Sequence, residues 1–310
     1  MIGHKRSYGG YLIQRARRRL INSLYRRLYR DDAPDQSRCL MLAGTARTGT
    51  TWLAELIGSN QPTRIMFEPF HPAQVPDYAS FKSFLFMRPD EPNAALHDYC
   101  DRVFTGRIRN PWIDDMIEVL RPQARIVKDV RANLLLKWIN RQFPSIPLVL
   151  LLRHPCAVAH SRMELRWPAD QDLSCLTSQK NLKEDFLRNK EDLINGAQYE
   201  EEKNAVIWCI HNMVPLSQFG DGGLNVVRYE DLLSNKAEVM AGLMQSIGWQ
   251  GGDAVNASPE RPSRTTSLST ALDGALVANS RWKNNLSVQQ IDRIFKVVDM
   301  FGLGHLYQQD

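Results

Sequence analysis

Residues 42–53, which read LAGTARTGTTWL, constrain the fold of this chain more than any other segment. The segment starts apolar, as a strand does, passes through a turn rich in glycine and threonine, and ends in a helical pattern. Such a turn exposes backbone N–H groups at a helix N-terminus, where the helix dipole favours an anion. Gly44 and Gly49 also have the spacing of the GxxxxGK(S/T) phosphate loop. The segment therefore predicts a phosphate-binding loop between a strand and a helix.

Two positions depart from the pattern of proteins that bind nucleoside triphosphates. Thr50 stands where the motif has its lysine, and Arg47 supplies a cation three residues earlier. The apolar segment 148–152 is followed by Arg153, where a triphosphatase would have an aspartate that holds Mg²⁺. Because the lysine and Mg²⁺ together bind the β- and γ-phosphates, their loss favours an anion bound by arginines without a metal. A kinase or another P-loop triphosphatase is the less favoured alternative.

Strand-like and helical segments alternate along the rest of the chain. Apolar segments bounded by turn residues or charges predict strands at 39–43, 64–67, 125–127, 148–152 and 224–228. Periodic apolar residues predict helices at 51–58, 112–120, 134–141, 157–165, 204–219 and 237–247. Segment 148–152 is apolar throughout, which is typical of a parallel strand buried on both faces. We predict an α/β fold like that of P-loop nucleoside triphosphate hydrolases, with three layers, a central parallel sheet, and helical insertions at 70–122 and 166–203 that shape a substrate cleft.

Composition excludes several classes of protein. The chain has 310 residues, 43% of them hydrophobic, and no apolar run reaches the roughly 18 residues that a membrane span needs. Its five cysteines are scattered and form no CxxC pair, so neither a disulfide scaffold nor a zinc finger is indicated. An uninterrupted apolar segment of the kind found in secretory signals is also missing. We expect a cytoplasmic protein that needs no metal.

The first 30 residues form a strongly basic tail, with nine basic side chains and no acidic one. Because the net charge of the chain is +5, residues 31–310 carry −4, and a nucleic-acid-binding body is not indicated. Apolar residues at helical spacing predict a basic amphipathic helix in the tail and a turn-rich linker that ends at residue 35. This helix could lie on an anionic membrane at the inner face of the cell membrane. It could equally pack against the single domain expected for residues 36–310.

Four segments, in order along the chain, resemble sulfotransferases that use 3′-phosphoadenylyl sulfate (PAPS) as donor. Residues 47–52 (RTGTTW) resemble the loop for the 5′-phosphosulfate, and residues 150–163 (LLLRHPCAVAHSRM) resemble the segment for the 3′-phosphate. Residues 227–232 (VRYEDL) are similar to the RYEDL element of carbohydrate and tyrosylprotein sulfotransferases, and residues 280–283 (SRWK) to their segment that closes over the donor. The chain is thus identified as a PAPS-dependent sulfotransferase that resembles the carbohydrate and tyrosylprotein branch.

The resemblance implies two anion sites for the donor. One contains Arg47, and the other pairs Arg153 with Ser161, because a planar guanidinium suits a phosphate. Taken singly, Arg153 could be a salt-bridge partner at a strand end, Tyr229 a buried core tyrosine, and Lys283 a solvated charge. The donor-binding residues that the resemblance implies are Arg47, Thr48, Gly49, Thr50, Thr51, Trp52, Arg153, Ser161, Tyr229, Ser280, Arg281 and Lys283.

The resemblance also implies catalytic residues. Glu68, in MFEP at 66–69, stands where carbohydrate and tyrosylprotein sulfotransferases have their glutamate base, although it could instead order the loop. Its aromatic and proline neighbours predict a partly desolvated carboxylate with a raised pKa. Lys128, at the end of the third predicted strand, resembles the lysine of the KDP element, with Val130 in place of the proline. Lys128 and Arg47 would stabilise charge on the sulfuryl and leaving-group oxygens.

Neighbouring residues leave alternatives open. Asp129 and Arg131 would support Lys128 or form only a salt bridge. Three histidines rival Glu68 as base, namely His71, His154 and His160. His71 is the strongest rival, because cytosolic aryl and steroid sulfotransferases use a histidine, although they carry it in a later segment.

The MFEP and RYEDL segments make a carbohydrate or glycolipid hydroxyl the expected acceptor. A small molecule and a protein tyrosine remain alternatives. A regulator at a membrane that binds a nucleotide without catalysis is a further alternative, against which Glu68 and Lys128 speak.

Overall fold

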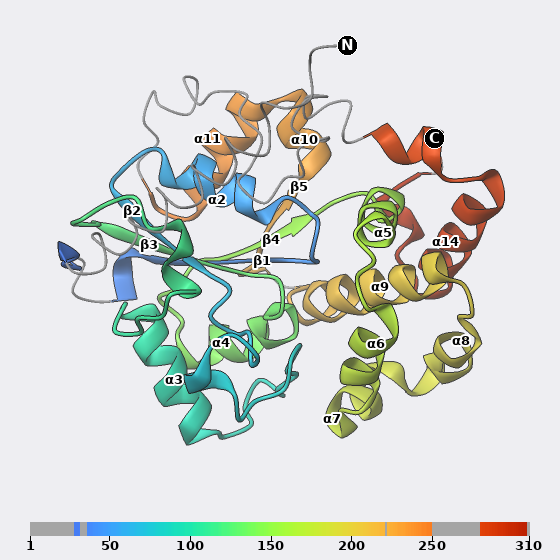
Figure 1. The fold of residues 1–310 in the computed structure, drawn as a ribbon, viewed down its shortest axis with the longest axis horizontal. Helices are drawn as coiled ribbons and strands as arrows, with labels where there is room; N and C mark the ends of the chain where they lie inside the picture. Colours follow the sequence, from blue (N-terminus) through green and yellow to red (C-terminus); the bar gives the residue numbers. More distant parts are fainter. Residues whose placement is uncertain (1–27, 32–35, 221, 250–279, 309–310) are drawn as a thin grey trace, which may run out of the picture.

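The computed structural model describes residues 28–31, 36–220, 222–249 and 280–308. Within them, five parallel strands form one sheet in the order β2-β3-β1-β4-β5 (Figure 1). The strands are β1 (Cys39–Gly44), β2 (Thr63–Phe67), β3 (Ala124–Asp129), β4 (Leu148–Leu152) and β5 (Asn225–Arg228). The predicted α/β fold with a central parallel sheet is confirmed.

Helices cover both faces of the sheet and give three layers (Figure 1). One face carries α2 (Thr50–Gly58), α10 (Tyr229–Ser234) and α11 (Lys236–Ser246), and the other carries α3 (Ala94–Phe104), α4 (Leu136–Gln142) and α9 (Glu200–Gln218). In β1, Leu40 and Leu42 pack toward the first set, whereas Met41 and Ala43 pack toward the second. Because alternate side chains of a strand point to opposite faces, an entirely apolar strand must be covered on both.

The carboxyl ends of the strands meet at one edge of the sheet. Lys128 of β3 pairs with Leu42 of β1 and with Phe67 of β2, while Leu152 of β4 pairs with Arg228 of β5. Residues that follow the strands therefore come together at this edge, where open parallel sheets bind their ligands. Predicted site residues lie at or just after the carboxyl end of each strand.

The two predicted insertions differ in helix content. Residues 166–203, described throughout, form α6 (Ala169–Thr177), α7 (Lys180–Leu182), the π-helical η5 (Lys183–Leu187), η6 (Arg188–Lys190), α8 (Glu191–Gly196) and the start of α9. Residues 70–122, also described throughout, form α3 and the 3₁₀ helices η2 (Pro76–Tyr78) and η3 (Ile113–Met116). The remaining elements are η1 (Gln36–Arg38), η4 (Asn133–Leu135), α5 (Pro155–Glu164), α14 (Val288–Met300) and η7 (Gly304–Leu306).

The helix predicted at 112–120 is wrong. The four-residue η3 forms there instead, and Ile117 after it is extended, with φ −70° and ψ 125°. Asp114, in η3, is buried and accepts hydrogen bonds from Arg64 Nη2 at 2.7 Å and Arg109 Nε at 2.8 Å. These ion pairs hold the segment against β2 in an irregular conformation. Because Arg64 lies far away in sequence, local apolar spacing could not reveal this contact.

Residues 28–31, at the end of the basic tail, pack against the domain. The Tyr29 ring lies 4.1 Å from Arg109 Cζ, and its hydroxyl donates to Asp31 Oδ2 at 2.8 Å. Asp31 in turn accepts from Arg125 Nη2 at 2.8 Å. The rest of the predicted amphipathic helix falls on residues 1–27, outside the described residues. In the described part of the chain, no helix combines the length and apolar character needed to cross a bilayer.

Candidate active site

The predicted phosphate loop joins β1 to α2, and its two glycines stand where a side chain would not fit. Gly49 has φ 97° and caps α2, and a Cβ there would lie 2.7 Å from Cε2 of the Tyr229 ring. A Cβ at Gly44 would lie 2.8 Å from the Leu151 carbonyl oxygen of β4. Within the turn, Thr48 N donates to Thr45 O at 3.1 Å. The loop is therefore a tight turn whose backbone packs directly on β4 and Tyr229.

Arg47 connects this loop to the helix that follows β4. Its backbone is left-handed, with φ 78°, and its Nε donates to Ser161 Oγ at 3.1 Å. Arg153 Nη1 donates to the Arg47 carbonyl at 2.9 Å. The sequence predicted that Ser161 and Arg153 share one anion site, and the structure adds a hydrogen bond from Arg47 to Ser161. The two expected anion sites are thus joined through Arg47.

Burial and mutual repulsion leave the two arginines suited to an anion. Desolvation, followed by the charge of Arg153, lowers the pKa of Arg47. Desolvation also lowers the pKa of Arg153, opposed by Tyr229 and Glu230. Two neighbouring guanidinium groups in a partly dry site bind a phosphate more strongly than they would in water.

Tyr229 lies beneath the phosphate loop. Arg153 Cζ is 4.5 Å from the centre of its ring, and the Trp52 ring contacts it edge-on at 5.4 Å between centroids. Tyr229 is buried, and burial raises the pKa of its hydroxyl. These contacts bring together the end of β5, the start of α2 and the end of β4. Thr50 and Thr51 lie buried in the first turn of α2.

Glu68 and Lys128, on neighbouring strand ends, are in direct contact. Lys128 Nζ lies 2.6 Å from Glu68 Oε1, and both side chains are nearly inaccessible, at 4% and 10% exposed. Arg131 Nη1 lies 2.6 Å from the other oxygen, Glu68 Oε2. Glu68 also has φ 45°, a left-handed backbone that is uncommon outside glycine and often marks functional positions. Arg131, which was expected only to support Lys128 or to form a salt bridge, thus contacts the expected base itself.

The raised pKa expected for Glu68 is not found. Burial acts to raise the pKa of this carboxyl, but the charges and hydrogen bonds of Lys128 and Arg131 outweigh it and lower the pKa. The sequence indicated the desolvation and missed the second cation, which lies three residues after Lys128 in the turn that follows β3. Glu68 is therefore held as a carboxylate.

Asp129 fixes the two loops that carry these residues. Its Oδ2 accepts from Phe70 N at 2.7 Å, and its Oδ1 accepts from Arg131 N, also at 2.7 Å. Burial, then the charge of Glu68, raises the pKa of Asp129 to about 6. One buried carboxyl thus ties the backbone after β2 to the backbone after β3.

The three rival histidines have different surroundings. His71 packs edge-on against Trp112, at 5.3 Å between ring centroids, and burial followed by the charge of Arg131 lowers its pKa to about 4. His154 caps α5 and stacks on Trp282 at 4.4 Å. His160 lies in α5, where burial lowers its pKa. The charge of Glu68 also acts on His71 and partly opposes the lowering of its pKa.

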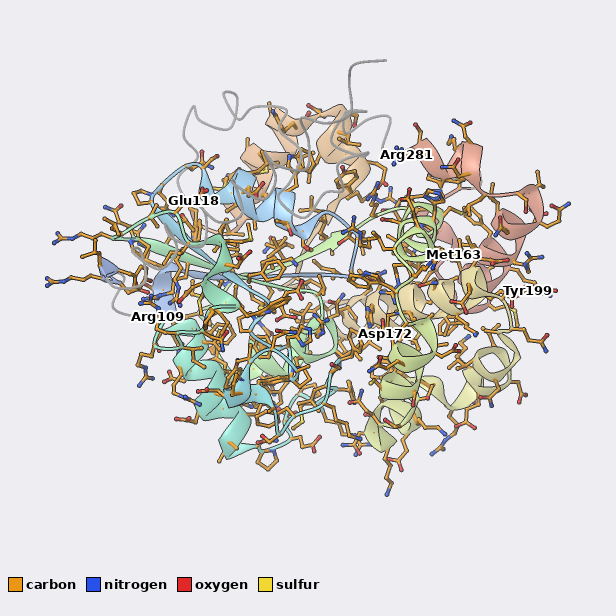
Figure 2. The ribbon with its side chains drawn as sticks, viewed as in Figure 1. Arg109, Glu118, Met163, Asp172, Tyr199 and Arg281 are labelled. Carbon is orange, nitrogen blue, oxygen red and sulfur yellow. The ribbon has the colours of Figure 1, made fainter. Side chains whose placement is uncertain are left out.

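The segment expected to close over the donor lies next to α5. Residues 280–285 are helical, and Trp282 is buried against His154. Arg281 Nη1 lies 3.9 Å from Glu164 Oε1, and Figure 2 shows Arg281 at this end of the molecule. Ser280 and Lys283 are exposed, and Lys283 Nζ lies 5.6 Å from the Trp282 ring centre. The sequence named the charged residues of this segment and missed Trp282, which anchors it.

Comparison with solved structures matches the chain to several sulfotransferases and to a dehydratase, each at low identity. The sulfotransferase domain of the Synechococcus PCC 7002 olefin synthase is 13% identical over 88% of this chain and 98% of that chain, with a TM-score of 0.46. The sulfotransferase domain from the curacin biosynthetic pathway is 11% identical over 85% and 97%, with a TM-score of 0.44. Retinol dehydratase, in a complex with retinol and PAP, is 10% identical over 87% and 82%, with a TM-score of 0.42. These likenesses are distant.

Family membership follows from the sequence comparison. A search of curated proteins finds no match. The model of the sulfotransferase family matches residues 40–253, which is more than half of the chain and includes the phosphate loop, Glu68, Lys128 and Arg153. The chain belongs to the sulfotransferase family.

Proposed function

We propose that the protein transfers a sulfuryl group from PAPS to an acceptor hydroxyl on a carbohydrate or glycolipid. The observation that carries this proposal is the buried contact of Lys128 Nζ with Glu68 Oε1 at 2.6 Å, one strand away from the phosphate loop. Sulfuryl transfer needs a base for the acceptor proton and a cation for the charge on the leaving group. Glu68 and Lys128 supply both at one place.

The phosphate loop supports PAPS as the donor. The buried Thr48 hydroxyl has no hydrogen-bond partner among the described residues, as expected for a group that binds a ligand. Arg47 and Arg153 lie close enough to share the donor's anionic groups. We propose that Thr48, Gly49, Thr50, Thr51 and Trp52 complete the 5′-phosphosulfate site. Ser161, Tyr229, Ser280, Arg281 and Lys283 are the further donor residues of this proposal.

Glu68, Lys128 and Arg47 divide the proposed reaction between them. Glu68 accepts the proton of the acceptor hydroxyl while the hydroxyl oxygen forms its bond to sulfur. Lys128 and Arg47 stabilise the negative charge that develops as the bond between sulfur and the phosphate oxygen breaks, which releases adenosine 3′,5′-bisphosphate (PAP). When Lys128 turns to the leaving group, Glu68 loses one of its two cations and becomes more basic. Arg131 then keeps the carboxylate in place.

The resemblance of the MFEP and RYEDL segments supports a carbohydrate or glycolipid acceptor. We further propose that the protein works in the cytoplasm and that its basic tail brings it to anionic membrane surfaces. Nine cations without an acid in residues 1–30 support this attraction. A membrane position would place the active site near lipid-linked acceptors.

Transfer of labelled sulfate tests the proposed function. The protein is incubated with PAPS carrying radioactive sulfur and with separate pools of oligosaccharides, glycolipids, phenols and tyrosine peptides. We expect label in the carbohydrate or glycolipid pool, and label in the phenol or peptide pool alone would contradict the acceptor class.

A second experiment tests the donor by thermal unfolding. PAP without Mg²⁺ should raise the melting temperature of the protein more than Mg-ATP does. Equal or stronger stabilisation by Mg-ATP would contradict the donor.

A further inference from the structure

Three buried side chains near the expected base carry polar atoms with no partner. They are His211, with both ring nitrogens unpartnered, Arg162, with Nη1 unpartnered, and Asn133, with Oδ1 unpartnered, counting all described residues as possible partners. Each side chain belongs to a residue that is at most 1% exposed. We call these three residues the α9 polar cluster. Buried polar atoms are nearly always hydrogen-bonded in native proteins, so this concentration of exceptions needs an explanation.

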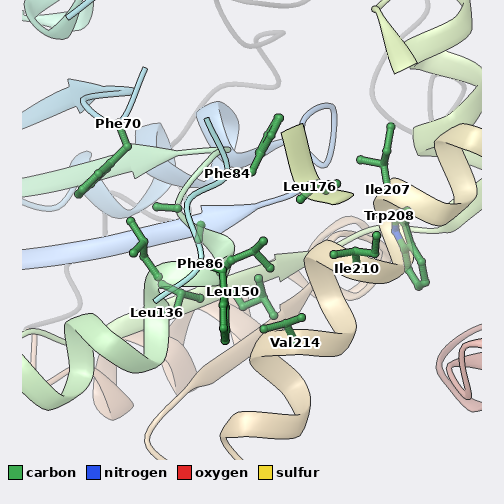
Figure 3. Close-up of a cluster of buried hydrophobic side chains, with 14 of the residues drawn as sticks. Phe70, Phe84, Phe86, Leu136, Leu150, Leu176, Ile207, Trp208, Ile210 and Val214 are labelled. Carbon is green, nitrogen blue, oxygen red and sulfur yellow. The ribbon is translucent and has the colours of Figure 1, made fainter. Parts of the chain in front are cut away.

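The cluster lies at the carboxyl edge of the sheet, beside the Glu68 site. His211 is in α9, and Asn133 of η4 donates from Nδ2 to the His211 carbonyl at 3.1 Å. The Phe84 ring contacts the His211 ring at 4.8 Å between centroids, and Arg131 Cζ lies 6.0 Å from the centre of the same ring. Figure 3 shows Phe84 in the buried hydrophobic cluster that also includes Ile207 and Ile210 of α9. The guanidinium that binds Glu68 is therefore separated from the cluster by one aromatic ring.

Arg162 is held so that one nitrogen remains unused. Its Nε donates to Asn204 Oδ1 at 2.5 Å, and its Nη2 lies 2.6 Å from Asp172 Oδ2. Asp172 sits at the end of α6 that lies next to α9 (Figure 2). With two of its nitrogens fixed, the guanidinium cannot turn to satisfy Nη1 without breaking an existing bond.

Donors and acceptors are mixed in the cluster. Burial, then the charges of Arg162 and Arg131, lowers the pKa of His211 to about 3, so its ring is neutral and has one N–H and one acceptor nitrogen. Arg162 Nη1 can only donate, and Asn133 Oδ1 can only accept. An anion would satisfy the donors and be repelled by Asn133 Oδ1. Hydroxyl groups both donate and accept, so a ligand with several hydroxyls matches the whole set.

We propose that the α9 polar cluster binds ring hydroxyls of a neutral, hydroxyl-rich acceptor whose reacting hydroxyl lies at Glu68. This inference rests on the proposed function and names the residues that would recognise its acceptor. The Phe84 ring lies against the His211 ring and must shift for such a ligand to reach that ring. The left-handed backbone of Phe84, with φ 54°, is held by Gln179, which donates to Phe84 O at 2.9 Å and accepts from Phe86 N at 2.8 Å.

Ligand binding to full-length protein saturated with PAP tests the proposal by saturation-transfer NMR. The probes are methyl glycosides of glucose, galactose and mannose, with methyl glucuronide as the acidic probe and phenol as the hydroxyl-poor one. We expect a signal for at least one neutral glycoside that exceeds those of glucuronide and phenol. His211→Leu should lower the signal of this glycoside at least fivefold. His211→Gln keeps a donor and an acceptor, so its signal should lie between those of His211→Leu and the wild-type protein. His211→Leu should also raise the melting temperature, because it removes unpartnered polar atoms from the interior.

Cys209→Ala is the matched control, because Cys209 is buried on α9 and lies about 200° around the helix from His211. This variant should change the melting temperature and leave the glycoside signal as it is. The proposal would be overturned if no neutral glycoside gave a signal, or if His211→Leu gave the same glycoside signal as the wild-type protein. The polar atoms of the cluster would then be satisfied by internal water. If the wild-type protein did not bind PAP at all, the proposed function itself would be refuted. Failure of this inference can therefore be told apart from failure of the proposed function.

Discussion

Arg131 Nη1 contacts Glu68 Oε2, while Lys128 Nζ contacts the opposite oxygen, Oε1, each at 2.6 Å. The two cations therefore hold one carboxylate from separate sides. In the reaction proposed above, Lys128 leaves Oε1 for the sulfuryl group while the contact at Oε2 stays in place. In the proposed reaction, Arg131 is a positioning residue and Lys128 a catalytic one.

Arg131→Ala should shift the pH dependence of transfer. Arg131 helps to lower the pKa of Glu68, so its removal raises that pKa. The acidic limb of kcat/KM, where Glu68 becomes protonated, should move to higher pH. Arg141→Ala, which removes an exposed arginine paired with Asp90, is the control and should leave the limb in place. If the acidic limb of kcat/KM stayed at the same pH in Arg131→Ala, Arg131 would have no effect on the pKa of the base.

Glu68→Gln should separate chemistry from donor binding. Glutamine keeps the size of the side chain but cannot take the acceptor proton, so kcat should fall by roughly 10²–10⁴-fold. The Kd for PAP, measured by calorimetry, should stay within about twofold. His71→Ala should keep most of its turnover. If Glu68→Gln remained active while His71→Ala was inactive, the base would be His71 and not Glu68.

Arg153→Ala should weaken PAP binding by about 1.5–3 kcal/mol, the value of a hydrogen bond to a charged group. Ser161→Ala should weaken it less, because Ser161 contributes a neutral hydroxyl and the position of Arg47. Calorimetric titration with PAP measures both effects. If both variants bind PAP as the wild-type protein does, the helix after β4 has no part in donor binding.

Gly49→Ala should damage the phosphate loop. A left-handed alanine costs about 1–2 kcal/mol, and its Cβ would lie 2.7 Å from the Tyr229 ring. We expect a lower melting temperature and at least tenfold weaker PAP binding. Gly242→Ala is the control: Gly242 lies in α11 with open space around it, so alanine should stabilise the protein by roughly 0.5–1 kcal/mol. Unchanged PAP binding in Gly49→Ala would argue against this loop as the donor site.

Deletion of residues 1–27 should abolish sedimentation with anionic vesicles. Each cation near such a surface contributes about 1 kcal/mol of attraction, which salt weakens, and the body of the chain carries net negative charge. The deletion keeps Tyr29 and its contacts, so PAP binding should be unaffected. Vesicles of neutral lipid are the control. A full-length protein that ignores anionic vesicles at low salt would refute the membrane role of the tail.

Much of the fold could be predicted because the strands are short, apolar and bounded by turns. Segments such as 148–152 can be buried only in the middle of a sheet covered on both faces, and the structure has β4 there. The sequence placed Glu68 and Lys128 at the ends of two predicted strands, but their contact depends on β2 and β3 being neighbours in the sheet, which the sequence did not show. The hydrogen bond from Arg47 to Ser161 could not be predicted, because it depends on how α5 packs against the phosphate loop. The same holds for the contact of Arg131 with Glu68, which depends on the turn after β3.

The packing of Gly49 on Tyr229 also bears on the order in which the protein can acquire its nucleotide site. The loop is encoded near the start of the chain, yet its supporting ring belongs to the residue that follows β5. During synthesis, the loop sequence would leave the ribosome long before Tyr229 and Arg153 were both present. We expect nascent chains that end before β5 to lack nucleotide affinity, although they contain the entire glycine-rich motif.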